Sequence, residues 1–126
     1  MRKLSLLFGA LCLVYAAVFY LGALLHAGVV VGALREPFTP PAVLVETLCG
    51  SVLVAAGYGT LAGRRWASRV LVDAHAVALG GVLIGTLAVA LGEDTPTAYI
   101  TGYHRGMAVL LALGLGGAIY LSRSRR

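Results

Sequence analysis

Residues 4–34 read LSLLFGALCLVYAAVFYLGALLHAGVVVGAL, an apolar run without a single Lys, Arg, Asp or Glu. A helix needs about 20 apolar residues to cross the roughly 30 Å hydrocarbon core of a bilayer. Further apolar stretches follow after short polar breaks, at 42–62, 70–91 and 97–121. The sequence therefore predicts an all-α integral membrane protein. We expect one four-span transmembrane domain over residues 1–126, a four-helix bundle with antiparallel neighbours because the connections are short.

The composition agrees with a chain that is mostly membrane. Of 126 residues, 60% are hydrophobic, 12% are charged and 17 are glycine. A soluble domain usually carries about 25% charged residues and about 7% glycine. Little sequence remains outside the spans, so we expect no separate soluble domain.

The basic residues are distributed as topology signals. The net charge is +5, and eight of the ten Lys and Arg fall in three clusters: Arg2-Lys3, Arg64-Arg65-Arg69 and Arg123-Arg125-Arg126. All three clusters lie on one side of the membrane if the chain crosses it four times. By the positive-inside rule this predicts cytoplasmic N- and C-termini in a cytoplasmic (inner) membrane, with membrane lipids as partners. The pattern does not indicate nucleic-acid binding.

The ends of the helices can also be predicted. The first helix, 4–34, would run roughly 45 Å at 1.5 Å per residue, so we expect it to tilt, bend or protrude, and to remain uncleaved. Pro40 and Pro41 suit the start of the second helix, and Gly63 suits its end. Ser68 is the expected N-cap of the third helix and Thr95 that of the segment leading into the fourth.

Ionisable side chains inside the predicted spans are few. A charge at the bilayer centre costs on the order of 3 kcal/mol on insertion scales, so each is a candidate functional residue. His26 lies about 13 Å along its helix before Arg35, and Glu46 about 7 Å past Pro41, at the helical rise. His104 lies near the outer start of the fourth helix. We expect His26, Glu46 and His104 at a similar depth in the outer half of the membrane.

These three residues allow several interpretations. His26 and His104 can ligate a b-type haem if both imidazoles point inward, in a haem- or quinone-binding membrane anchor. Together with Glu46 they can hold a divalent metal, or relay a proton because imidazole titrates near neutral pH. The plainer interpretation is a hydrogen bond from Glu46 to His26 or a neighbouring hydroxyl that ties two helices together. The sequence favours no cofactor and no metal over this last interpretation.

Asp73 and His75 are secondary candidates near the opposite end of the bundle. They are two positions apart, about 200° around a helix, so they cannot line one pocket. Asp73 follows Arg69 by four residues near a helix N-terminus, which predicts a local ion pair. We expect His75 to hydrogen-bond across the bundle.

No motif indicates catalysis. The sequence has no Ser-His-Asp spacing, no H-E-x-x-H, no phosphate-binding loop and no C-x-x-C. Cys12 and Cys49 are expected at different depths, too far apart for a disulfide. We therefore expect no enzymatic activity, and no motif secures membership of a known family.

Small residues indicate how the helices pack. Each predicted span carries a Gly-x-x-x-Gly pair: Gly28/Gly32, Gly59/Gly63, Gly81/Gly85 and Gly102/Gly106. We interpret these pairs as contacts within the bundle, with self-association as the alternative, since small residues permit close approach of helices in lipid.

The function that the sequence favours is non-catalytic: a structural or interaction subunit, or a lipid-binding bundle. It would pack against a larger membrane complex or form a homo-oligomer. The alternative is a small proton-coupled transporter that uses Glu46 and His26.

Overall fold

Four helices form the whole of the secondary structure in the described residues, 2–92 and 95–124 of the computed structural model. They are α1 (Arg2–His26), α2 (Pro40–Leu61), α3 (Ala67–Leu91) and α4 (Ala98–Arg123). Each is long and apolar enough to cross a membrane. The predicted all-α fold with four apolar helices is therefore confirmed.

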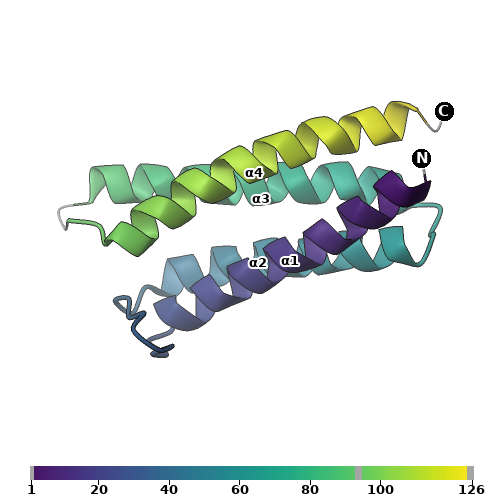
Figure 1. The fold of residues 1–126 in the computed structure, drawn as a ribbon. Coiled ribbons are helices and arrows are strands. Elements are labelled where there is room, and N and C mark those ends of the chain that lie inside the picture. The colour runs from purple at the N-terminus through teal and green to yellow at the C-terminus, as the bar shows by residue number, and fades with distance from the viewer. Residues whose placement is uncertain (1, 93–94, 125–126) are drawn as a thin grey trace.

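The helices lie side by side along one axis (Figure 1). The α1–α2 and α3–α4 connections lie at one end of the bundle, here called the two-loop end. The α2–α3 turn, the start of α1 and the end of α4 lie at the opposite end. This arrangement brings the C-terminus of α1 and the N-termini of α2 and α4 together at the two-loop end.

The first helix is shorter than the sequence predicts. It ends at His26, and residues 27–39 form an irregular loop that contains an isolated bridge between Val31 and Leu34. Gly28 and Gly32 have φ values of +87° and +60°, in the left-handed region that only glycine adopts readily. Both glycines therefore interrupt the helix, and this Gly-x-x-x-Gly pair is not a helix contact.

The helix ends follow the predicted signals in part. Pro40 and Pro41 occupy the first turn of α2, as predicted, and Gly63 follows its end with φ +64°. The prediction that Ser68 caps α3 is wrong, because α3 begins at Ala67 without a side-chain cap. The prediction for Thr95 is also wrong: Thr97 caps α4, its hydroxyl accepting from Ile100 N at 3.1 Å.

Helices α1 and α2 pack closely because small residues face each other. A Cβ added at Gly57 would lie 2.9 Å from the carbonyl oxygen of Gly9, so neither backbone leaves space for a side chain. Small-residue contacts of this kind drive helix association where lipid removes the hydrophobic force between helices. The buried face of α1 repeats every three or four residues: Ser5, Gly9, Cys12, Ala16, Phe19, Ala23 and His26.

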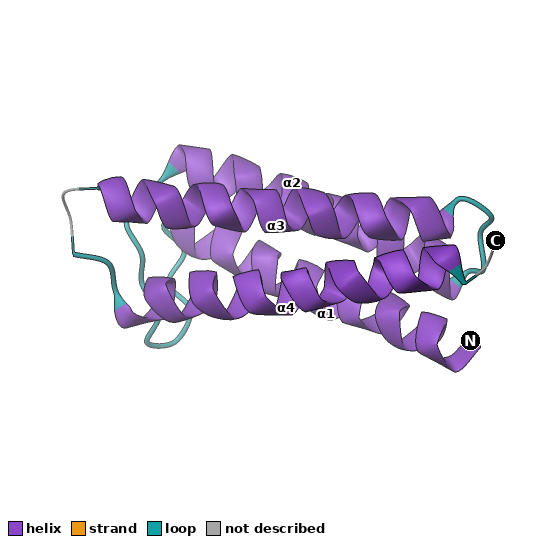
Figure 2. Ribbon diagram, turned by 90° about the horizontal axis from the view of Figure 1, so that it is seen from above, coloured by secondary structure: helices purple, strands orange, loops and turns teal. Residues whose placement is uncertain are grey.

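The bundle is less tightly closed on its other side. Helix α3 packs against α2 and α4, whereas α1 and α4 approach each other at few positions. Figure 2 shows from a second side that the four helices run along one axis. Large apolar side chains cover the outside of the helices, among them Leu44, Leu87, Val109 and Leu113. An outer surface of this kind suits contact with lipid.

Candidate functional site

A cavity of about 380 Å³ lies at the two-loop end of the bundle. All four helices contribute to its wall, and so do both loops at this end. Its polar lining includes His26, Glu36, Thr39, Glu46, Thr97, Tyr103 and His104. The rest of the lining is mostly aliphatic, aromatic, proline or glycine.

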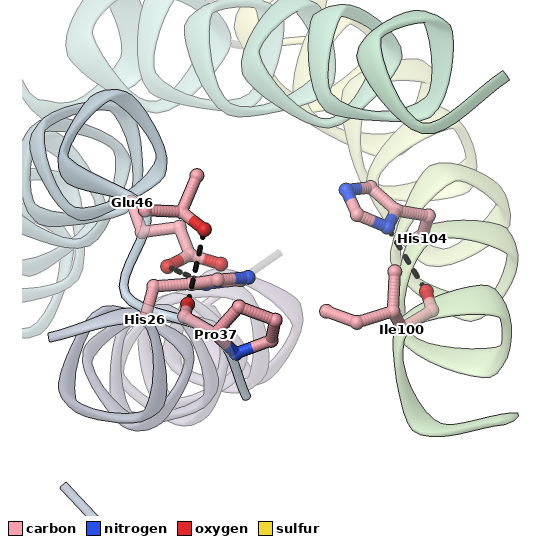
Figure 3. A network of polar contacts seen from close by, with 6 residues as sticks. His26, Pro37, Glu46, Ile100 and His104 are labelled. Atoms are coloured by element: carbon pink, nitrogen blue, oxygen red, sulfur yellow. Dashed lines mark hydrogen bonds and ion pairs between the residues drawn. The ribbon is translucent and has the colours of Figure 1, made fainter. Parts of the chain in front are cut away.

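His26 and Glu46 form one wall of the cavity. His26 Nδ1–H donates to Glu46 Oε2 at 2.9 Å, and both side chains are buried. In Figure 3 the His26 ring extends from α1 into the space between the helices. When His26 is protonated, this contact is a buried ion pair between α1 and α2. The pairing that the sequence suggested is therefore present.

Local backbone geometry positions this pair. His26 is the last residue of α1 rather than 13 Å inside it, but the loop folds back so that Thr39 N donates to His26 O at 2.9 Å. The start of α2 is thereby held beside the end of α1. Gly22 makes room for the carboxylate, since a Cβ there would lie 2.5 Å from Glu46 Oε1.

His104 lies on the opposite wall. Its Nδ1–H donates to Ile100 O at 2.9 Å within α4, and its Nε2 faces Gly85 of α3, where no Cβ obstructs it. Figure 3 shows His104 across the open space from the His26–Glu46 pair. The three candidate residues therefore line one cavity, but His104 does not contact the other two.

This separation bears on the cofactor hypotheses. In the part of the chain that the structure describes, no three His, Cys, Asp or Glu residues are grouped closely enough to hold a metal ion. A bis-imidazole haem needs both rings to aim at one iron, whereas His104 Nε2 is turned toward α3. The arrangement of His26, Glu46 and His104 thus supports neither the metal nor the haem hypothesis.

Glu36 is a cavity residue that the sequence reasoning missed. Its side chain is buried although it belongs to the α1–α2 loop. Glu36 Oε1 accepts from the hydroxyl of Thr97 at 2.8 Å, and the same hydroxyl caps α4. This bond ties the loop to the start of α4 across the cavity. The available signal was the position of Glu36 four residues before α2, since this limits how far Glu36 can lie from the start of that helix.

Tyr103 is a second missed residue. It lines the cavity from α4 and contacts Phe19 of α1 edge-on, with ring centroids 6.3 Å apart. Its hydroxyl is buried and makes no hydrogen bond within 3.5 Å among the described residues, but it lies beside the Glu46 carboxylate. Buried hydroxyls usually find a partner, and the nearby acceptor for the Tyr103 hydroxyl is Glu46.

The cavity reaches the outside of the bundle along α3. Ile84 contributes to the lining and is 64% exposed, and Ala88, one turn further along, is also exposed and lines the cavity. A molecule could therefore reach the cavity from the flank of the bundle, which faces lipid if the helices span a membrane.

The secondary candidates lie away from the cavity. Asp73 is exposed, and the predicted ion pair with Arg69 is not formed. His75 is fully buried between the rings of Phe8 and Tyr15, and its Nδ1–H donates to Leu71 O at 2.8 Å. This bond lies within α3, and His75 Nε2 has no hydrogen-bond partner among the described residues, so the prediction of a hydrogen bond across the bundle is wrong.

Comparison with protein-family models, with curated proteins and with solved structures finds no match to this chain.

Proposed function

We propose that this chain is a non-catalytic, multi-pass membrane protein that binds a small, largely apolar molecule in the cavity at the two-loop end. The observation that carries the proposal is the cavity of about 380 Å³, which combines mostly apolar walls with the buried His26–Glu46 pair. Ligand sites typically have about this size and this mixture of apolar surface with a few polar groups. A bundle with only structural polar contacts would be expected to fill the space between its helices.

The proposal includes an orientation in the membrane. We infer antiparallel neighbours and cytoplasmic N- and C-termini in a cytoplasmic (inner) membrane. The basic clusters at Arg2-Lys3, at Arg64-Arg65-Arg69 and at the C-terminus support this orientation through the positive-inside rule. The two-loop end and its cavity would then face away from the cytoplasm.

Membrane lipids are the partners that the outer surface favours. The exposed side chains of α2, α3 and α4 include Leu44, Leu87 and Leu113, which suit contact with acyl chains. A larger complex or a homo-oligomer is the alternative partner. For a homo-oligomer, Gly102/Gly106 is a helical glycine pair at which an added Cβ would meet no described atom within 4 Å.

A binding measurement tests the proposal. Neopentylbenzene, a neutral phenyl-bodied probe, is equilibrated with the protein in dodecyl maltoside micelles, and binding to empty micelles is subtracted. We expect one saturable site per chain. Ala42→Phe should remove it by filling the cavity, since Ala42 belongs to the lining.

Leu113→Phe is the matched control, because it adds a ring on the outer surface, where Leu113 is 71% exposed. It should leave binding unchanged. The proposal fails if neither neopentylbenzene nor its cationic isostere benzyltrimethylammonium shows saturable binding that Ala42→Phe removes.

Proton-coupled transport is the second candidate function. It is favoured by one observation, the direct hydrogen bond between two proton-exchanging groups, His26 and Glu46, in the wall of a cavity. In proteoliposomes, Glu46→Gln should then abolish probe-dependent proton movement while the protein still folds. A binding bundle without transport would show no such movement in the wild type.

A further inference from the structure

Apart from the His26 imidazole, which is paired with Glu46, the charged groups that line the cavity are acidic. Glu36 and Glu46 belong to the lining, whereas no Lys or Arg among the described residues does. The basic residues nearest in sequence, Arg35 and Arg105, are both exposed. Carboxylates in a low-dielectric cleft focus a negative potential within it, and this potential raises the local concentration of cations.

Glu36 is the carboxylate that lacks a charged partner. Its side chain is 7% exposed, and its hydrogen bond comes from the neutral hydroxyl of Thr97. No Lys, Arg or His lies within ion-pairing distance of it in the described ranges. A buried carboxylate is costly unless a cation compensates it, so a bound cation would supply what the chain does not.

The aromatic lining suits an organic cation. Phe19 and Tyr103 come from α1 and α4, and their rings meet edge to face in the cavity wall. Aromatic faces attract ammonium groups, quaternary ammonium in particular. The Tyr103 hydroxyl lies beside Glu46 and adds an oxygen to the polar part of the cavity wall.

The cavity does not suit a small inorganic cation. The described residues contain no group of three His, Cys, Asp or Glu that could hold a metal ion. Calcium and magnesium take about six oxygen ligands, whereas most of this wall is apolar. The opening at Ile84 also leads to the flank of the bundle, where an apolar body would be favoured.

We propose that the molecule bound in this cavity is an amphiphilic organic monocation, an amine or a quaternary ammonium compound. Its charged group lies on the side of Glu46 and Glu36, and its apolar body lies against Phe19, Val82 and Ile84. This inference rests on the proposed binding function and specifies the ligand class of the same site.

Three probes of similar shape and different charge test the inference. They are benzyltrimethylammonium, its neutral carbon isostere neopentylbenzene, and the anionic benzylsulfonate, each measured by equilibrium dialysis in dodecyl maltoside micelles. We expect the cation to bind at least ten-fold more tightly than the neutral probe, and the anion to show no saturable binding.

Two neutralising substitutions locate the selectivity. Glu46→Gln and Glu36→Gln should each lower the cation-to-neutral affinity ratio by about ten-fold while neopentylbenzene still binds, which shows that the cavity is intact. Asp73→Asn is the matched control, because it neutralises an exposed carboxylate outside the cavity. It should leave the ratio unchanged.

The outcomes separate this inference from the proposed function. If neopentylbenzene binds in an Ala42→Phe-sensitive manner but the cation binds no more tightly, the inference is overturned and the binding function stands. Equal ratios in the wild type, Glu46→Gln and Glu36→Gln would also overturn it. If no probe shows binding that Ala42→Phe removes, the proposed function itself fails.

Discussion

At the scale of single residues, the His26–Glu46 pair is the contact with most influence on both stability and binding. A side-chain hydrogen bond between membrane helices contributes on average about 0.6 kcal/mol to stability. A buried donor or acceptor left without a partner costs more, about 1–3 kcal/mol. The effect of a substitution at Glu46 therefore depends on whether the new side chain can still accept from His26 Nδ1–H.

This difference predicts unequal effects of two substitutions. Glu46→Ala leaves the buried His26 donor without an acceptor, so the free energy of unfolding should fall by about 2 kcal/mol. Glu46→Gln retains an acceptor oxygen, so the free energy of unfolding should fall by less than about 1 kcal/mol. Both are measured by SDS titration in mixed micelles, followed by circular dichroism.

Leu48→Ala provides the control, because Leu48 lies on α2 and is 58% exposed. It should lower the free energy of unfolding by less than Glu46→Ala does. Equal losses for the two alanine variants would show that the hydrogen bond contributes nothing to stability.

The sequence predicted which residues line the site, but it did not predict how their side chains are arranged. His26, Glu46 and His104 were identified because ionisable groups are rare within apolar spans, and all three line the cavity. Their mutual orientation depends on the loop 27–39 and on the space at Gly85, which no periodicity reveals. Glu36 was missed because a carboxylate in a loop is usually solvated; its burial depends on the distant Thr97.

At the scale of helices, hydropathy located the apolar segments but not every helix end. The predicted 42–62 and 70–91 agree closely with α2 (Pro40–Leu61) and α3 (Ala67–Leu91). The prediction of 4–34 failed at its end because hydropathy measures transfer into lipid, not backbone conformation. The positive φ values of Gly28 and Gly32 explain why an apolar sequence leaves the helix there.

The cap of α4 is a testable feature at this scale. Thr97→Ala removes both the bond to Ile100 N and the bond to Glu36, so the free energy of unfolding should fall by about 1–2 kcal/mol. Thr95→Ala serves as the comparison, since Thr95 is exposed and lies before the helix. A larger loss for Thr95→Ala would contradict the observed cap.

The contact between α1 and α2 is sensitive to one methyl group. In Gly57→Ala the new Cβ would meet the backbone oxygen of Gly9 at 2.9 Å, and a backbone atom cannot rotate away. The helices must separate, which should cost about 1–3 kcal/mol. SDS titration measures the loss.

Gly116→Ala is the matched substitution on α4, where a Cβ would meet nothing within 4 Å. The free energy of unfolding of Gly116→Ala should be unchanged or rise by up to about 1 kcal/mol, because alanine has a higher helix propensity than glycine. Similar effects at Gly57 and Gly116 would show that close backbone contact does not hold α1 to α2.

At the scale of the whole molecule, the orientation in the membrane decides from which side the cavity is reached. The proposed orientation places the loop 27–39 outside and the α2–α3 turn in the cytoplasm. Ala33 and Ala62 are exposed residues of these two segments. The native Cys12 and Cys49 are buried, so they contribute little labelling of their own.

Single cysteines at these positions report the orientation directly. In intact cells, a membrane-impermeant maleimide should label Ala33→Cys, and it should label Ala62→Cys only after the membrane is permeabilised. The physical reason is the location of six basic residues of the described ranges at the end of the bundle opposite the two-loop end, since Lys and Arg are retained on the cytoplasmic side. Labelling of Ala62→Cys alone in intact cells would reverse the orientation, and the acidic cavity would then take its ligand from the cytoplasmic side.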